Sequence, residues 1–295
     1  MSVPHLPGST ARGTIGGVSA ASPERVPRPS GPEVVAHRGS SVEKPEHTLS
    51  AYLRAIEHGA DALECDVRLT ADNHLVCVHD RRVNRTSNGR GLVSTLELAH
   101  LENLDWGSWK ATEEDPRDTE APDRDSGRLL TLRRLLDAVR DCGRPVRVVI
   151  ETKHPTRYAG QVERRLAEVL ASYGWARSRN GRPPPVRMMS FSQLALARMR
   201  QLAPDVPRVL LVEERVPLRF REGALPRGVE VMGLDIAVLR RQPGFAERLH
   251  SRGHRLHVWT VDEPADVDLC VRLGVDAIIT NRPGEVLAHL GRRPA

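Results

Sequence analysis

Ionisable side chains stand at the ends of several short apolar runs in this chain. Two of them are imidazoles, which titrate near neutral pH and can accept or donate a proton. Three are carboxylates, which bind hard divalent cations, and two are cationic groups that attract phosphate oxygens. Groups of these kinds are suited to metal-assisted cleavage of a phosphate ester. They are His37, Arg38, Glu64, Asp66, His79, Glu151 and Lys153.

Glu64 and Asp66 flank Cys65 within one apolar run. Side chains two positions apart in a β-strand point to the same side, so both carboxylates would face one way and Cys65 the other. Two carboxylates this close raise each other's pKa unless a cation lies between them. With Glu151 as a third oxygen ligand, the set suits Mg²⁺ or Ca²⁺ better than zinc. The alternative is a structural network in which these acids pair with arginines.

The two histidines, His37 and His79, each end an apolar run. One imidazole can take a proton while the other donates one, so the pair is a candidate acid and base. A lone histidine at a strand end is more often structural, but two of them beside three carboxylates favour catalysis. Asp80 follows His79 directly and could orient its imidazole.

Two cations and one aromatic residue complete the candidate site. Arg38 offers a forked donor to phosphate oxygens. Lys153 lies two positions after Glu151 and would face the same side of a strand. It is also one of only three lysines among 44 Lys and Arg residues, so it is not readily explained as a common surface residue. Trp259 could form a wall of the substrate pocket, although packing inside a barrel is an equally ordinary use of an aromatic side chain.

Continuous apolar runs alternate with helical segments along the chain, which is typical of buried parallel strands joined by helices. Eight such strands predict a closed (β/α)8 TIM barrel, an α/β fold of roughly 250 residues. Active sites of this fold lie at the carboxyl ends of the strands. The expected strands are 34–37, 62–66, 147–152, 187–191, 208–213, 231–235, 256–261 and 276–280; the expected helices are about 46–58, 130–142, 160–173, 193–203, 243–252 and 264–274, and 214–230 has no clear assignment.

The run Leu75–His79 predicts one further strand. Only Ala71–His74 separate it from the strand that contains Asp66. Because a parallel connection needs a dozen or more residues, this strand must return antiparallel. The hairpin arm would bring His79 back toward Glu64 and Asp66.

The remaining segments suggest the domain boundaries. Residues 1–33 are rich in Pro, Gly, Ser and Ala and predict a flexible N-terminal tail before a barrel at 34–290. The stretch 80–128 is too long for an ordinary barrel loop and predicts a small, partly ordered insertion. Its acidic part, 112–127, is expected to be solvated. A calcium site there is the alternative, but the run lacks the ligand spacing and glycine of a calcium loop.

The composition is that of a soluble globular protein, with 295 residues, 39% hydrophobic and 28% charged. The net charge is +6, but the arginines are scattered and aromatic residues make up only 3%, so nucleic acid is not an expected partner. No run is long enough to span a bilayer or to form a signal-peptide core, so no stable membrane insertion is expected. The four cysteines have no CxxC spacing, which is typical of a reduced, cytoplasmic protein.

Taken together and in order, the motifs resemble those of the glycerophosphodiester phosphodiesterase family from about residue 34 to 288. Any one motif is a weak signal, whereas their joint order is specific. They are His37-Arg38-Gly39, Pro45-Glu46-His47-Thr48, the segment Gly59–Val67, His79-Asp80, the segment Arg85–Gly89, Glu151-Thr152-Lys153, Ser190-Phe191, Trp259-Thr260-Val261 and the segment Gly274–Pro283.

The resemblance implies a TIM barrel with a small inserted subdomain. It also implies hydrolysis of small-molecule glycerophosphodiesters to glycerol 3-phosphate and an alcohol, with a divalent cation as cofactor. Carried over by position, His37 and His79 match the acid and base, and Arg38 and Lys153 the phosphate-binding cations. Glu46 matches a supporting glutamate. The metal ligands would be Glu64, Asp66 and Glu151.

Two positions depart from the family pattern. His47 stands where the family usually has asparagine, and Asn281 stands where an aspartate is common. Neither is a principal metal or acid/base position, so the departures bear on substrate detail rather than on catalysis.

Three rival functions remain at this stage. A lysophospholipase D-like enzyme would need an apolar surface at the mouth of the barrel, and the insertion has little apolar character apart from its tryptophans. A non-catalytic barrel that binds glycerophosphodiesters would have no need of an acid/base pair. A metal-dependent isomerase or aldolase would act on a carbonyl substrate and release no phosphate.

Overall fold

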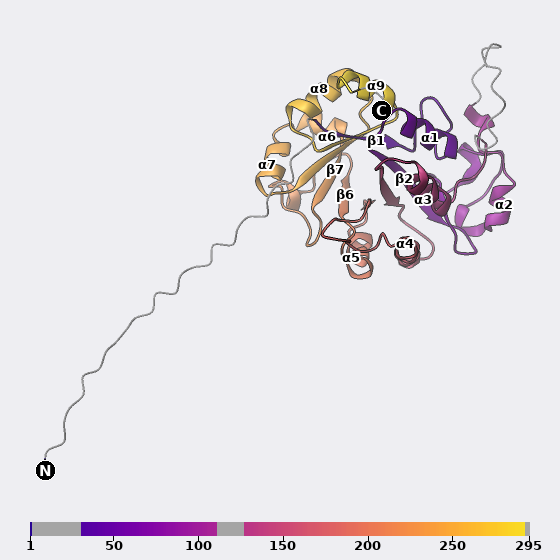
Figure 1. Ribbon diagram of the computed structural model, residues 1–295, viewed down its shortest axis with the longest axis horizontal. Helices are drawn as coiled ribbons and strands as arrows, with labels where there is room; N and C mark the ends of the chain where they lie inside the picture. Colours follow the sequence, from indigo (N-terminus) through magenta and orange to yellow (C-terminus); the bar gives the residue numbers. More distant parts are fainter. Residues whose placement is uncertain (2–30, 111–126, 293–295) are drawn as a thin grey trace. The chain divides into compact units, whose positions relative to one another are not determined.

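Eight parallel β-strands form a closed ring in the computed structural model, which describes residues 1, 31–110 and 127–292 (Figure 1). Neighbouring strands pair in chain order, and β1 pairs with both β2 and β9, which closes the ring. The predicted TIM barrel is therefore confirmed. Its strands are β1 (Glu33–His37), β2 (Ala62–Leu69), β4 (Arg147–Thr152), β5 (Val186–Ser190), β6 (Arg208–Val212), β7 (Val231–Asp235), β8 (Arg255–Trp259) and β9 (Ala277–Thr280).

Helices lie between most of the successive barrel strands and surround the sheet (Figure 1). Thr48, Thr131 and Ser192 each begin a helix, because each side-chain oxygen accepts a hydrogen bond from the N–H three residues later. The helices are α1 (Leu49–Glu57), α2 (Leu98–Glu102), α3 (Leu132–Asp141), α4 (Gln161–Ser172), α5 (Gln193–Leu202), α6 (Ile236–Arg241), α7 (Phe245–Ser251), α8 (Pro264–Arg272) and α9 (Pro283–His289).

Several helical segments differ from the predictions. The sequence pattern missed α2, α6 and α9, which have five, six and seven residues and are too short to show a helical period. The unassigned stretch 214–230 contains only a short 3₁₀ helix, η4 (Leu218–Phe220).

Apolar side chains fill the space between the sheet and the helices and, separately, the inside of the barrel. Cys65 belongs to the outer region, as its position between Glu64 and Asp66 predicted. Inside, Gly233 leaves room for Leu211, because a Cβ at Gly233 would lie 2.6 Å from Leu211 Cδ2. The inner cluster consists of Val35, Ala62, Val149, Met189, Val209, Leu211, Val231, Ala277 and Ile279.

The inside of the barrel is layered along the strand direction. β1 places Glu33 at its amino end, Val35 in the middle and His37 at its carboxyl end. Glu33 pairs with Arg187, whose Nη1 lies 3.1 Å from Nε2 of His257. Polar pairs therefore fill the amino end and apolar residues fill the middle, which leaves the carboxyl end for other groups.

The hairpin predicted after β2 is present. β3 (Leu75–Cys77) pairs antiparallel with β2, which therefore continues to Leu69 instead of ending at Asp66. The N–H of Val78 donates to the carbonyl oxygen of Asp66 at 3.0 Å. His79, the next residue, is therefore brought back beside the end of the barrel strand.

The described part of the insertion contains η1 (Val83–Arg85), η2 (Val93–Thr95), α2 and η3 (Ser108–Lys110). It packs on β3 and its neighbours through a small apolar cluster formed by Val76, Val78, Val83, Val93, Leu101, Trp106 and Leu129. The tail predicted at 1–33 falls almost wholly on residues outside the described ranges. The acidic stretch 112–127, with its alternative reading as a calcium site, also falls there, except for Gly127.

Among the described residues, no helix combines the length and apolar character needed to cross a membrane. All four cysteines are free thiols.

Candidate active site

Three carboxylates meet at the carboxyl ends of β2 and β4. Asp66 lies opposite Glu151 in the parallel register, and Glu64 precedes Asp66 by two positions on the same strand. One oxygen atom from each lies within 4.8 Å of the other two, and all three side chains are buried. The structure thus brings together the three acids that the sequence selected.

The electrostatics of this cluster favour a bound cation. Burial raises the pKa of Glu64 well above its ordinary value, and the charge of Asp66 raises it further. The same two causes raise the pKa of Glu151 to about 8. Lys153 Nζ lies 2.8 Å from Glu151 Oε1 and 3.0 Å from Asp66 Oδ1. Among the described residues, that Asp66 oxygen nevertheless accepts no hydrogen bond of normal geometry. The oxygen donors therefore fit a hard divalent cation, whose charge would relieve their mutual repulsion.

Two residues in the left-handed region hold the other oxygen of Asp66. Arg38 has φ +59° and places Nε 3.1 Å from Asp66 Oδ2, while His47 has φ +61° and places Nε2 at 2.9 Å. Non-glycine residues adopt this conformation rarely, and it is held here by the surrounding contacts. Burial would raise the pKa of Asp66, but the hydrogen bond from His47 and the charge of Lys153 hold it well below its ordinary value. Asp66 is therefore the anionic centre of the cluster.

Asn281 orients His37. Nδ1 of His37 lies 2.8 Å from Asn281 Oδ1, and the amide nitrogen of Asn281 donates to Asp262 Oδ2. Because Asp262 fixes which end of the amide is the oxygen, His37 carries its proton on Nδ1. Nε2 is then free to accept a proton and lies 4.0 Å from Glu64 Oε2. Burial, with the charge of Arg38, lowers the pKa of His37 to about 4, so the imidazole is neutral at pH 7.

Asp80 orients His79 in the same way, but with a charged partner. Asp80 Oδ1 accepts a hydrogen bond from Nδ1 of His79 at 2.7 Å. The backbone carbonyl of His79 accepts two N–H bonds from Arg68. Burial lowers the pKa of His79 below its ordinary value, with Arg38 and Lys153 lowering it further, and the opposing effects of Asp66 and Asp80 offset only part of this. The imidazole therefore has carboxylates nearby that would stabilise its protonated form.

Arg85 connects Asp80, the partner of His79, with Glu46, the partner of Arg38. It donates to Asp80 Oδ2 at 2.8 Å and to both oxygens of Glu46 at 2.8 Å. Glu46 in turn accepts from Arg38 Nη1 at 3.0 Å. A continuous polar network therefore runs from His79 through Asp80, the Arg85 guanidinium and Glu46 to Arg38 and the acid cluster.

Trp259 ends β8 and packs partly against the inner apolar cluster. Its ring lies 5.7 Å from that of Phe191, edge to face. Its Nε1 is buried and has no hydrogen-bond partner among the described residues. The ring therefore packs as the ordinary use of an aromatic residue in a barrel predicts, and a role for Trp259 as a wall of the substrate pocket stays a prediction.

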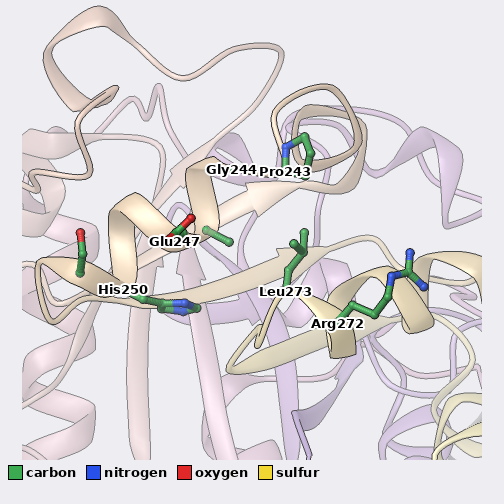
Figure 2. A pocket seen from close by; sticks show the side chains of 8 residues that line it. Pro243, Gly244, Glu247, His250, Arg272 and Leu273 are labelled. Atoms are coloured by element: carbon green, nitrogen blue, oxygen red, sulfur yellow. The ribbon is translucent and has the colours of Figure 1, made fainter.

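A wider hollow of about 540 Å³ lies on the outside of the barrel, between α7 and α8 (Figure 2). Glu247 and His250 of α7 and Arg272 of α8 line it, and His250 pairs with Asp276 at 3.1 Å. None of the carboxylates or histidines described above lines this hollow, so the acid and base chemistry does not extend to it.

Sequence reasoning did not assign roles to four residues that shape the site. His47 and Asn281 were noted only as departures from a pattern, yet they contact Asp66 and His37 directly. Tyr52 places its hydroxyl 2.8 Å from His47 Nδ1, and Arg85 bridges Glu46 across 39 positions of sequence. For His47 and Asn281 the signal was the departure from the family pattern, and for Arg85 it was the place of this residue in the motif segment Arg85–Gly89.

Known proteins give an independent comparison. Residues 37–285 match the glycerophosphoryl diester phosphodiesterase family. A Mycobacterium tuberculosis protein named "Probable glycerophosphodiester phosphodiesterase 1" is 44% identical over 262 residues, which is 88% of this chain and 92% of that protein. The glycerophosphodiester phosphodiesterase of Bacillus subtilis is 33% identical over 269 residues, covering 90% and 89% of the two chains.

Solved structures are similar as well. A glycerophosphodiester phosphodiesterase from Agrobacterium tumefaciens has a TM-score of 0.67 at 26% identity, covering 87% of this chain and 99% of that one. An Oleispira antarctica phosphodiesterase, solved with the product sn-glycerol-3-phosphate, has a TM-score of 0.75 at 24% identity, with coverage of 88% and 97%. The similarity to the Oleispira antarctica structure shows the fold alone.

Proposed function

The chain belongs to the glycerophosphodiester phosphodiesterase family, and on this premise we propose that it uses one divalent cation and two histidines to hydrolyse its substrates. The substrates are glycerophosphodiesters, and the products are glycerol 3-phosphate and an alcohol. The observation that carries the proposal is the group of three buried carboxylates at the strand ends, with the charge of Asp66 acting on both imidazoles.

Glu64, Asp66 and Glu151 would hold the cation. When bound, a Mg²⁺ or Ca²⁺ ion supplies positive charge that stabilises the negative charge developing on the phosphate oxygens. Arg38 and Lys153 supply further positive charge from the protein. Within the described part of the chain, Nη2 of Arg38 makes no hydrogen bond, so this donor is available to a phosphate oxygen.

The two histidines differ in a way that suits opposite roles. His37 is neutral, has a free Nε2 and faces an amide, so it is the candidate base. His79 faces Asp80, which stabilises an imidazolium, so it is the candidate acid. His37 removes a proton from the nucleophile as its oxygen bonds to phosphorus. The bond from phosphorus to the alcohol oxygen then breaks, and His79 donates a proton to that oxygen.

The nucleophile is water or the neighbouring hydroxyl of the glycerol, and the products distinguish the two. Attack by water gives glycerol 3-phosphate directly, whereas attack by the hydroxyl gives a cyclic phosphate that accumulates before glycerol 3-phosphate. Phosphorus NMR of the reaction at early times separates these products.

The decisive experiment uses glycerophosphocholine and glycerophosphoethanolamine as substrates, with Mg²⁺ or Ca²⁺ and with EDTA. We expect glycerol 3-phosphate and the free alcohol to form only with the metal present. Phosphocholine as the product would mean that the other ester bond breaks. Binding of either compound without turnover would indicate a binding protein and overturn the proposal.

A further inference from the structure

A second crevice lies beside the acid cluster, between the end of β2, the insertion and the loop that follows β4. Leu69 comes from β2, Leu92–Ser94 from the insertion, and Pro155 and Thr156 from the loop. Lys153 lines this crevice and also contacts Glu151 and Asp66. Lys153 therefore belongs both to the wall of the crevice and to the acid cluster, so the two lie next to each other.

The polar lining of this crevice is cationic. Arg68, Arg81 and Arg157 join Lys153 along its walls, and no carboxylate lines it within the described ranges. The guanidinium of Arg68 donates to the carbonyl of His79, and that of Arg157 lies 5.7 Å from the ring of Tyr158. None of these three arginines forms an ion pair with a described residue, whereas nearby Arg38 and Arg85 are each paired with two carboxylates.

Lys153 is paired with Glu151 and Asp66, but the three arginines form no ion pair with a described residue, so they repel one another and attract a negative group from solution. Guanidinium groups stay charged at any physiological pH and match the oxygens of phosphate or carboxylate in pairs. The crevice has about 30 Å³ of space for the centres of water-sized atoms. At ~10–15 Å³ per water this holds roughly two or three oxygen-sized atoms. It fits the end of a ligand whose remainder lies elsewhere.

We propose that this crevice is a subsite for a second negatively charged group on the substrate, and this inference rests on the function proposed above. The glycerol half is the same in every glycerophosphodiester and carries no charge. The second charge must therefore belong to the alcohol. The preferred substrates are glycerophosphodiesters whose alcohol carries a phosphate or a carboxylate, held by Arg68, Arg81 and Arg157 while the scissile phosphate lies at Lys153.

The test compares two substrates that differ by one anionic group. Glycerophosphoglycerol has a neutral alcohol, and bis(glycerophospho)glycerol is the same compound with a second glycerophosphate attached. We expect kcat/KM, from initial release of glycerol 3-phosphate, to be at least ~10-fold higher for the second compound, since one good charged contact is worth about that factor. Glycerophosphoserine tests whether a carboxylate serves in place of the phosphate.

The double variant R81Q/R157Q should bring the ratio of the two kcat/KM values close to one, and R81K/R157K should restore part of it. The control is Arg255→Gln, at the exposed amino end of β8, which should keep the wild-type ratio. A ratio near one in the wild type, or a ratio that R81Q/R157Q does not change, would overturn the subsite. Failure of the wild type to hydrolyse glycerophosphoglycerol at all would instead refute the proposed function.

Discussion

Replacing Glu151 with Gln in the metal-free protein tests the electrostatics of the acid cluster. The pKa of Glu151 is about 8 in the folded chain against an ordinary 4.5, because of burial and the charge of Asp66. Between these two pH values the folded state binds more protons than the unfolded state, so the folded state loses stability as the pH rises. From pH 5 to pH 8 this loss is at most about 4 kcal/mol, at 1.36 kcal/mol per pH unit. Glutamine does not titrate, and the variant should escape this loss.

The assay is urea unfolding in EDTA at pH 5, 6, 7 and 8, on the wild type, Glu151→Gln and the exposed control Glu247→Gln. We expect the free energy of unfolding of Glu151→Gln, relative to the wild type, to increase steadily across this range. Any fixed effect of losing the contact with Lys153 shifts all points equally and leaves the trend intact. Glu247→Gln should run parallel to the wild type. A difference in unfolding free energy between Glu151→Gln and the wild type that does not change with pH would refute the argument that burial and the charge of Asp66 raise the pKa of Glu151.

Three other predictions concern the histidines and the turn that precedes α1. His37→Ala and His79→Ala should fold normally, by circular dichroism, with turnover at least ~100-fold lower, while exposed His100→Ala keeps wild-type turnover; near-normal turnover would remove that histidine from the mechanism. The pKa of His37 is lowered to about 4, so its imidazole stays neutral on acidification. Protonation of His37 should therefore cause no decrease in kcat/KM between pH 7 and pH 5.5. A decrease centred near pH 6.5 that His37→Ala abolishes would contradict this. Gly39→Ala should lower the free energy of unfolding by about 2 kcal/mol or more in urea titrations, because Gly39 has φ +87° and an added Cβ would lie 2.6 Å from the Ala51 backbone; an unchanged midpoint would show that the turn can relax.

The fold was predictable because its signals are local. Each barrel strand is a continuous apolar run, and the four residues Ala71–His74 forced the hairpin to be antiparallel. The period of two along a strand was enough to place Glu64 and Asp66 on one side. Short elements such as α6 were missed because six residues do not show a helical period.

The supporting contacts were not predictable, because they join segments far apart in the sequence. Asn281 meets His37 across 244 positions, and only the closure of β9 against β1 brings them together. His47 reaches Asp66 because its backbone lies in the left-handed region, which its residue type does not predict. The unusual residues His47 and Asn281 were visible in the sequence, but the residues that they contact were not.

The contacts of Lys153 predict that metal binding and product binding are coupled. Its ammonium lies 2.8 Å from Glu151 and 3.0 Å from Asp66, so without a metal it forms ion pairs with both carboxylates. A cation held by those acids would neutralise them in place of Lys153, and the ammonium could then contact phosphate oxygens. We therefore expect glycerol 3-phosphate to bind more tightly with Mg²⁺ than in EDTA, by about 10-fold, a typical coupling between two sites. Linkage requires Mg²⁺ to bind more tightly by the same factor when glycerol 3-phosphate is present, and calorimetry measures both. Lys153→Gln should shrink the coupling in both directions, and an unchanged coupling in that variant would show that the ammonium does not exchange partners.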